Sequence, residues 1–303
     1  MTPGPQSPSP ATCAGPAPPV RGAALLLVLW LIALLTALVG AFALSAQVEG
    51  LQGRVLVRGL AATNAARAGV EYAVTRVELE DPLRQWLPDG RPHAWRYAGA
   101  EIEVRITDEN GKVDLNQAPM PLLTSLLRAL GVEQMEAGRL AGAIADWRDP
   151  DSLTQPSGGA ENADYAAAGR AYGAKDAAFE SIAEVEQVLG FTPELYARIQ
   201  PLVTVYSGRA QPDTAFAPAE VLDALGMDGA ALVDRRRDVD PVTGLSPDAA
   251  ALANRSGTYS IHSRAQLPDG RQSGLHVVIR AGGNAATGMA YTALRWEEGV
   301  SAQ

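Results

Sequence analysis

The chain has 303 residues and a mass of 31.7 kDa; 47% of its residues are hydrophobic and 19% are charged. This composition supports a packed core and excludes a chain that is disordered throughout. The formal net charge of −9 argues against a general electrostatic grip on nucleic acid. Because Cys13 is the only cysteine, neither an internal disulfide nor a cysteine-based metal cage can form.

The N-terminal segment predicts a membrane anchor. Residues 1–20 contain seven prolines and no charged side chain, so we expect no helix there. Between Arg21 and Glu49 lie 27 uncharged residues, and about 20 are enough for a helix to cross a bilayer. The positive-inside rule then places residues 1–21 in the cytoplasm and exports residues 49–303.

Two other export signals compete with this interpretation. A cleaved signal peptide has an apolar core of about 7–15 residues, shorter than the one here, although Ala41-Phe42-Ala43 is similar to its cleavage motif. A lipoprotein signal at Cys13 fits less well, because proline and serine precede this cysteine where apolar residues are needed. A single membrane anchor is therefore favoured.

Apolar residues continue beyond the predicted membrane span at steps of three and four, which is a helical period. They run from Val48 to Val77, and no proline lies between Val20 and Pro82. We expect one helix over about residues 23–80, roughly 85 Å long at about 1.5 Å per residue. Its predicted bend points are Gly50, Gly53, Gly59 and Gly69.

The exported part predicts an antiparallel sheet. Apolar and charged residues alternate from Glu101 to Asp108, which is typical of a half-buried strand, and Asn110-Gly111 predicts a hairpin turn into a strand at 113–115. Further strands are expected at 203–206, 259–263, 275–279 and 291–296, the last three as a meander. His262 and His276 fall on these strands, and we expect surface or cross-strand residues there, not ligands.

Between the strands a short pattern occurs three times: Leu130-Gly131-Val132, Leu189-Gly190-Phe191 and Leu225-Gly226-Met227. Each copy predicts a helix, a glycine turn and a second helix, similar to a helix-hairpin-helix unit. Such units often hold a nucleic-acid phosphate. Acidic residues around the first two copies oppose this role, and the bases Arg235–Arg237 after the third are flanked by aspartates. A membrane-anchored DNA receptor is therefore kept only as the alternative function.

An acidic loop is the strongest chemical signal. Its candidate metal ligands are Asp146, Asp149, Asp151, Glu161 and Asp164. Hard cations prefer oxygen ligands, and Ca²⁺ takes about six to eight of them, so backbone carbonyls of residues 152–158 would complete the shell. The pattern is not that of an EF-hand, and a solvated acidic loop remains the simpler alternative.

No motif predicts an enzyme. No Gly-x-Ser-x-Gly nucleophile elbow occurs in the chain. Asp146 and Asp149 could be imagined as an acid/base pair, but the sequence offers no apolar partner that would split their pKa values. We therefore expect a protein without catalytic activity.

Several ordered motifs resemble one family, the minor pseudopilin K of type II secretion systems. Arg21-Gly22 before the apolar run resembles a prepilin-peptidase site, with Ala23 as the first mature residue. Most pilins have Glu as the fifth mature residue, and its replacement, here by Leu27, is a mark of the K subunit. The remaining motifs are Asp114-Leu115-Asn116, Asp146-Trp147-x-Asp149-x-Asp151, Gly159-Ala160-Glu161, Phe179 to Val185 and Gly190 to Tyr196.

This resemblance implies an α+β fold. A pilin-like long N-terminal helix packs on an antiparallel sheet, with a large inserted all-helical domain of helix-hairpin-helix or SAM-like type. The implied division is a leader at 1–22, membrane and periplasmic helix halves at 23–48 and 49–81, a sheet domain at 82–116 and 202–303, and the insertion at 117–201.

The resemblance also implies a role. It predicts cleavage and methylation by prepilin peptidase between Gly22 and Ala23, and a structural site for two Ca²⁺ ions in the insertion. It predicts a single-pass protein of the bacterial inner membrane with a periplasmic C-terminal domain. Its partners would be the minor pseudopilins I and J, with which it would cap the tip of the pseudopilus; no nucleic acid is expected to bind.

Overall fold

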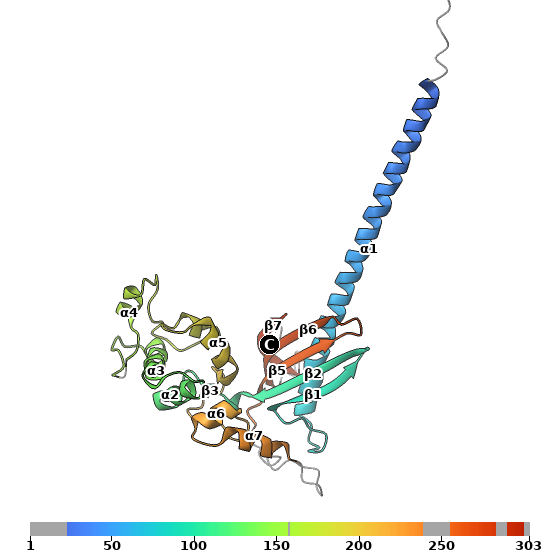
Figure 1. Ribbon diagram of the computed structural model, residues 1–303. Coiled ribbons are helices and arrows are strands. Elements are labelled where there is room, and N and C mark those ends of the chain that lie inside the picture. Colours follow the sequence, from blue (N-terminus) through green and yellow to red (C-terminus); the bar gives the residue numbers. More distant parts are fainter. Residues whose placement is uncertain (1–22, 157, 239–254, 283–289, 300–303) are drawn as a thin grey trace, which may run out of the picture. The chain divides into compact units, whose positions relative to one another are not determined.

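The computed structural model describes residues 23–156, 158–238, 255–282 and 290–299. Helix α1 (Ala23–Val77) has 55 residues and confirms the predicted long helix (Figure 1). Ala23 is its first residue, whereas Gly22 of the predicted cleavage site lies outside the described residues. The chain divides into two compact units, Met1–Val57 and Arg58–Gln303.

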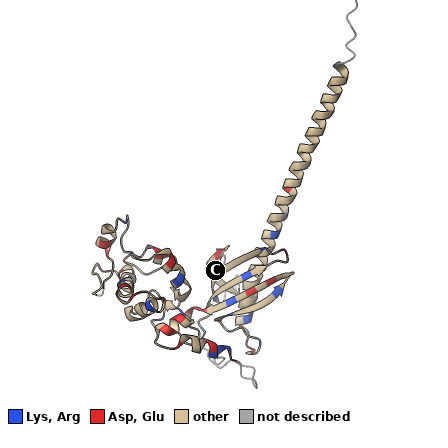
Figure 2. Ribbon diagram, in the orientation of Figure 1, with Lys and Arg blue, Asp and Glu red and all other residues tan. Residues whose placement is uncertain are grey.

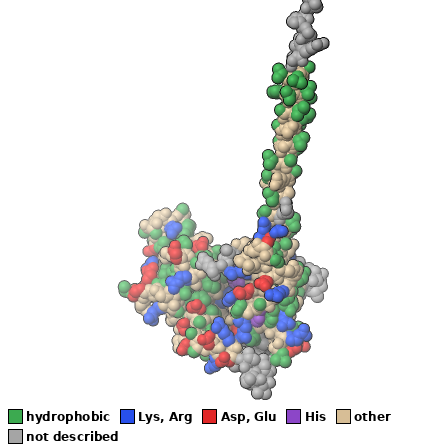
Figure 3. Space-filling model, turned by 45° about the vertical axis from the view of Figure 1, so that its right-hand side comes forward, with side chains coloured by type: hydrophobic (Ala, Val, Ile, Leu, Met, Phe, Trp, Pro, Cys, Tyr) green, Lys and Arg blue, Asp and Glu red, His purple; other side chains and the backbone are tan. Residues whose placement is uncertain are grey.

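The described part of the first unit is the apolar half of α1. Its described side chains are exposed, including Leu27 at 70% and Trp30 at 72%. In Figure 2 the first turns of this helix have the colour of uncharged residues, and Figure 3 shows these turns covered by hydrophobic side chains. By length and composition α1 can cross a membrane, so it is a candidate membrane anchor.

The second unit contains a five-stranded antiparallel sheet. Its strands, in spatial order, are β1 (Asp89–Tyr97), β2 (Ala100–Asp108), β5 (Thr258–Gln266), β6 (Gln272–Ala281) and β7 (Tyr291–Glu298). The predicted strand at 101–108 and the C-terminal meander are confirmed. In β2, burial alternates as the sequence predicts, since Ile102 and Val104 are buried while Glu101 and Glu103 are exposed.

The last turns of α1 cover one face of this sheet. Ala66, Val70 and Ala73 follow the helical period and are completely buried, in one cluster with Val104 and Ile261. Burial of these apolar side chains holds the helix on the sheet.

Gly69 lies at the closest approach between α1 and the sheet. A Cβ atom there would come within 2.2 Å of Ser263 Oγ and 2.8 Å of Ile102 Cγ2. By contrast, a Cβ at Gly50, Gly53 or Gly59 would meet nothing within 4 Å. The four glycines leave α1 unbroken, and the need for glycine at 69 is explained by close packing.

The predicted hairpin at Asn110-Gly111 is wrong. Glu109–Gly111 form the 3₁₀ helix η1, which Asp108 caps by accepting the Asn110 N–H at 2.8 Å. Strand β3 (Val113–Asp114) then pairs in parallel with β4 (Val203–Thr204) and does not return along β2. Glycine is needed at 111 because a Cβ would lie 2.5 Å from the Phe216 carbonyl carbon. The glycine that predicted a hairpin turn is therefore required by close packing.

Strand β1 is not predicted by the sequence. Pro92 lies within it, and the pairing with β2 shifts register between Asp89 and Pro92. Proline is tolerated because β1 is an edge strand, where one side of the backbone has no ladder partner. The Trp95 ring stacks on Tyr72 of α1 with ring centroids 4.3 Å apart, so tertiary packing stabilises this strand.

Apart from β4, the described elements between β3 and β5 are helices. They are α2 (Met120–Ala129), α3 (Gln134–Arg148), α4 (Asn162–Ala167), η2 (Ile182–Gln187), α5 (Pro193–Ile199), η3 (Gln200–Leu202), α6 (Ala219–Ala224) and α7 (Gly229–Arg237). They share a hydrophobic cluster separate from that of the sheet, with Leu126, Ile144 and Tyr165 fully buried. Leu222 of α6 also belongs to this cluster, which therefore continues past the predicted boundary at 201.

Two of the three predicted helix–glycine–helix units are confirmed. Gly131 and Gly226 both have φ of +80° and end α2 and α6. The N–H groups of the following residues, Val132 and Met227, reach back to carbonyl oxygens five residues earlier at 3.1 and 3.0 Å. At Gly190 the segment before the turn is the 3₁₀ helix η2 instead of an α-helix.

A buried ionic cluster joins the β3–β4 ladder to the sheet. Lys112 Nζ donates to Glu109 Oε1 at 2.6 Å and to Ser260 Oγ of β5 at 2.7 Å. Glu109 also accepts from the Thr204 hydroxyl of β4. Moving Glu109 away from Lys112 would leave an uncompensated buried charge, which is costly. These contacts therefore fix η1 in place.

Candidate metal centre

The C-terminal end of α3 positions the acidic loop. Asp146, in the last turn, is completely buried. Its Oδ2 accepts the Ala160 N–H at 2.8 Å and its Oδ1 accepts the Gln155 N–H at 3.3 Å. This carboxylate therefore folds the loop back onto the helix from which it departs.

Two glycines allow the loop to pack this closely against α3. A Cβ at Gly142 of α3 would lie 1.8 Å from the Gly158 carbonyl oxygen. A Cβ at Gly159 would lie 2.0 Å from Asp146 Oδ2. Any larger residue at either position would push the loop off α3, so these glycines set where the loop's carboxylates lie.

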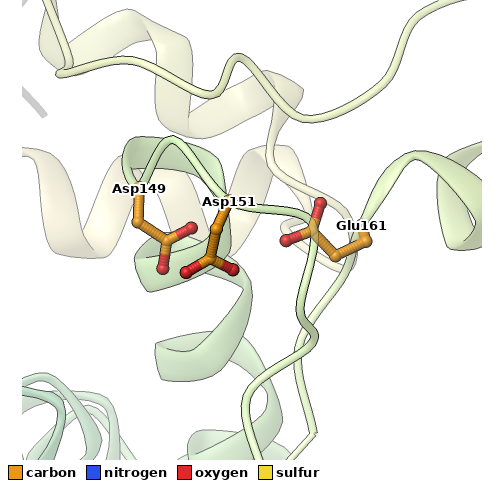
Figure 4. Close-up of side chains that lie close together, drawn as sticks. All are labelled: Asp149, Asp151 and Glu161. Atoms are coloured by element: carbon orange, nitrogen blue, oxygen red, sulfur yellow. The ribbon is translucent and has the colours of Figure 1, made fainter.

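Three of the five predicted ligands converge. One carboxylate oxygen each of Asp149, Asp151 and Glu161 lies within 4.8 Å of the other two (Figure 4). Asp149 caps the end of α3, Asp151 lies in the loop and Glu161 precedes the first residue of α4. Ligand oxygens about 2.3–2.6 Å from a common Ca²⁺ ion are separated by no more than about 5 Å, so this spacing suits one cation.

Three oxygen atoms of this cluster have no hydrogen-bond partner in the described part of the chain, whereas Asp151 Oδ1 accepts the Leu153 N–H at 2.8 Å and Asp149 Oδ2 accepts from Gln155 at 3.3 Å. Within the described residues, both carboxylate oxygens of Glu161 and Oδ1 of Asp149 are buried and accept no hydrogen bond. Burial raises the pKa of Asp149, and the nearby Asp151 raises it further. Burial also raises the pKa of Glu161, with the Asp146 carboxylate adding to the shift. Buried carboxylates that repel one another are costly, and a divalent cation would reverse that cost.

The other two predicted ligands hold the loop. Both oxygens of Asp146 are hydrogen-bonded to loop N–H groups, as described above. Asp164 lies in the first turn of α4, where its Oδ2 accepts the Glu161 N–H at 2.9 Å. Neither residue belongs to the three-carboxylate cluster. Their contacts fix the position of Glu161 from both sides of the chain.

Asp176 is a nearby acid that the sequence reasoning did not name as a ligand. Its charge raises the pKa of both Asp149 and Glu161. Its φ of +54° is unusual for a residue with a side chain. Strained backbone of this kind tends to occur at functional sites, but it appears only in the structure and leaves no trace in the sequence.

Buried polar contacts brace the helical part around this loop. Trp147 is 3% exposed, and its indole N–H donates to Glu184 at 3.4 Å. Glu184 also accepts from Lys175 at 2.9 Å. Asn116 clamps Phe179 by accepting its N–H at 2.7 Å and donating to its carbonyl at 3.0 Å. Residues of the recognised motifs thus serve to hold the segments that carry the carboxylates.

Comparison with protein families gives one clear match. Residues 104–208 match the family model described as "Type II secretion system (T2SS), protein K". This segment contains the second half of β2, the acidic loop and the helices that flank the loop. The resemblance predicted from the sequence motifs is therefore confirmed.

Similar proteins carry the same description. The type II secretion system protein K of Aeromonas hydrophila is 36% identical over 104 residues, which is 34% of this chain and 31% of that protein. The Pseudomonas aeruginosa protein is 29% identical over 42% of this chain and 40% of its own length. The Klebsiella pneumoniae protein is 28% identical over 77% of this chain and 79% of its own length. The first two alignments thus span well under half of each relative.

A solved structure shares the fold. It is the GspK-GspI-GspJ complex from the type 2 secretion system of enterotoxigenic Escherichia coli. The superposition covers 82% of this chain and 100% of the matched chain. Its TM-score is 0.57, and the two sequences are 18% identical. The similarity supports the mixed arrangement of helices and antiparallel sheet.

Proposed function

We propose that this chain, whose residues 104–208 match type II secretion system protein K, is a minor pseudopilin of that system. The family match carries the proposal. The exposed apolar half of α1 supports a membrane anchor, and the packed half supports a pilin-like domain with an inserted helical part. In this proposal the protein is a single-pass protein of the bacterial inner membrane, and its domain beyond α1 is periplasmic.

The protein caps the tip of the pseudopilus in our proposal. In the pilin family the fifth-residue Glu is thought to meet the N-terminal amine of a neighbouring subunit inside the helix bundle. A buried, unpaired carboxylate is costly, so a subunit with that Glu needs such a neighbour. Leu27 removes the requirement, which suits the foremost subunit. The helices between β3 and β5 add bulk that would block a further subunit.

Co-expression tests the tip role. Expressed alone in membranes, the full chain should form no filaments. With pseudopilins I and J, whose counterparts occur with GspK in the crystallised complex, it should co-purify as a discrete small complex. Electron microscopy of the purified material distinguishes the two cases. Long homopolymers of this chain, or failure to co-purify with either partner, would contradict the proposal.

Processing provides a separate test. We expect prepilin peptidase to cut after Gly22, so N-terminal sequencing of membrane-extracted protein should begin at Ala23. Gly22→Val places a branched side chain at the scissile position and should abolish the cut, whereas Gly40→Val, within the apolar run, should not. A mature protein that begins at Leu44 would mean cleavage by signal peptidase and would refute the pilin-type anchor.

We also propose that Asp149, Asp151 and Glu161 hold a structural Ca²⁺ ion. The number of two ions rests on the family resemblance alone. The unpartnered oxygens of Glu161 support at least one cation here. Asp146 and Asp164 would act through the loop, by keeping Glu161 in position.

The alternative DNA-binding role finds little support in the helix turns. In a phosphate-binding turn, the N-terminus of the second helix must be free to meet an anion. Here Glu133 caps α3 by accepting the Met135 N–H at 2.8 Å, and Asp228 caps α7 by accepting the Ala231 N–H at 3.0 Å. Carboxylates already occupy these positions and would repel a phosphate.

A further inference from the structure

Three side chains on neighbouring strands line up across the sheet. His262 of β5 lies opposite His276 of β6, and His276 lies opposite Glu297 of β7. Ile261 and Val277 belong to the core that faces α1, so strand alternation points both histidines to the opposite face. The two imidazole rings stack with their centroids 3.8 Å apart. The predicted cross-strand positions are thus confirmed, and the register makes the two histidines direct neighbours.

The two ring nitrogens of His276 have unequal surroundings. The residue is 8% exposed, and its Nδ1 lies 3.5 Å from Glu297 Oε2. Its Nε2 is buried and has no hydrogen-bond partner within the described residues. The other oxygen of Glu297 accepts from Arg295 Nε at 2.7 Å, which holds the carboxylate in place. An imidazole with a carboxylate on one nitrogen and a free second nitrogen is the usual arrangement of a metal-ligating histidine.

We propose that His262 and His276 bind a divalent transition-metal cation such as Zn²⁺ or Cu²⁺ on this face of the sheet. His276 coordinates through Nε2, His262 through one ring nitrogen, and water completes the shell. Imidazole nitrogen is a preferred ligand of these metals. Glu297 is a positioning residue that orients His276 and offsets the charge of the cation.

The site requires one rearrangement. In the stack the planes of the two rings are only 13° apart, so their nitrogen lone pairs run side by side instead of converging. His262 is exposed and can turn out of the stack, whereas the packed His276 stays in place. Rotation about the side-chain torsions of an exposed residue is inexpensive.

The surrounding charges limit the affinity. Burial, together with Lys112 and Arg295, lowers the pKa of His276 to about 3. The imidazole is therefore neutral at physiological pH, and a metal does not have to displace a proton. The same cations, with Arg105 on β2 opposite His262, oppose a divalent metal, whereas Glu297 and Glu109 favour it. Because these charges partly cancel, we expect the two histidines to bind the metal with moderate affinity.

Zinc titration of the full chain in detergent tests the proposal. The background carries Cys13→Ser and contains saturating Ca²⁺, so that neither the thiol nor the acidic loop takes up the metal. We expect one Zn²⁺ per chain by isothermal titration calorimetry. His262→Asn should weaken binding by at least about tenfold, and Glu297→Gln by about tenfold, as outer-shell changes do. The matched control is His93→Asn, because His93 stacks on Trp86 away from this pair.

Copper provides a readout of the ligands themselves. With one equivalent of Cu²⁺, electron paramagnetic resonance should show coupling to two nitrogens in the parent and to one in His262→Asn. His262 is exposed, so its variant should fold even if His276→Asn does not. No zinc uptake by the parent, unchanged affinity in His262→Asn, or a copper signal without nitrogen coupling would overturn the proposal.

Discussion

Removing Ca²⁺ from the full chain with a chelator is expected to lower its melting temperature by about 5–10 °C. One ion at about 100 times its dissociation constant stabilises the folded state by roughly 2.7 kcal/mol, and about 2–4 °C per kcal/mol is typical for a chain of this size. The physical reason is the cluster of Asp149, Asp151 and Glu161, in which Asp149 Oδ1 and both Glu161 oxygens are buried without a hydrogen-bond partner among the described residues. Melting scans with and without chelator, followed by the fluorescence of the chain's five tryptophans, measure the effect.

Glu161→Gln distinguishes a cation site from an ordinary acidic loop. In Ca²⁺ this variant should melt below the parent, because one ligand charge is lost. In chelator it should melt at the same temperature as the parent or above it, because a buried carboxylate without a hydrogen bond has become neutral. Glu220→Gln, at an exposed position of α6, is the matched control and should change neither value. Identical melting of the parent with and without chelator would remove the case for the ion.

The calcium effect should also depend on pH, with a definite sign. Burial raises the pKa of Asp149 and Glu161 in the cation-free fold, so that state gains stability as the pH falls through these raised values and loses it above them. Ca²⁺ binds only the ionised carboxylates. Both effects make the difference in melting temperature largest at neutral pH and smaller in acid. A difference that grew on acidification would contradict the assignment.

Sequence periodicity predicted the elements that obey a simple local pattern. The helix over α1, the alternating strand β2 and the C-terminal meander are examples. It failed where tertiary contacts decide. Asn110-Gly111 has the composition of a hairpin turn, but the approach of Phe216 requires the glycine and η1 forms instead. Strand β1 contains Pro92 and depends on ring stacking with α1, which no single-sequence pattern encodes.

The candidate site was partly predictable for a similar reason. Aspartates two residues apart in a proline-containing loop predict carboxylates that can converge, and Asp149, Asp151 and Glu161 do so. The sequence could not separate these from Asp146 and Asp164, because the distinction lies in which oxygens already accept backbone N–H groups. Asp176 approaches from a distant part of the loop, so only its position in space reveals it.

A valine at Gly69 should separate α1 from the sheet and destabilise the folded domain by about 3 kcal/mol. An added Cβ would already lie 2.2 Å from Ser263 Oγ and 2.8 Å from Ile102 Cγ2, and overpacking of this kind costs about 1–3 kcal/mol or more. Gly59→Val is the matched control, because a Cβ there meets nothing within 4 Å and the two residues differ by only a few tenths of a kcal/mol in helix propensity. Denaturant midpoints of the full chain measure both variants.

A double-mutant cycle can then assign the cost to one contact. Gly69→Ala should destabilise the domain despite the gain of about 1 kcal/mol that alanine brings to a helix. Ser263→Ala removes the atom nearest to the added Cβ, and because Ser263 Oγ is buried without a hydrogen bond, this change alone should be neutral or stabilising. The double variant should therefore recover part of the loss, with a coupling energy of about 0.5–3 kcal/mol. Strictly additive effects would mean that Ser263 does not oppose the added Cβ, and that the cost at Gly69 arises from its other close neighbours, Ile102 and Val104.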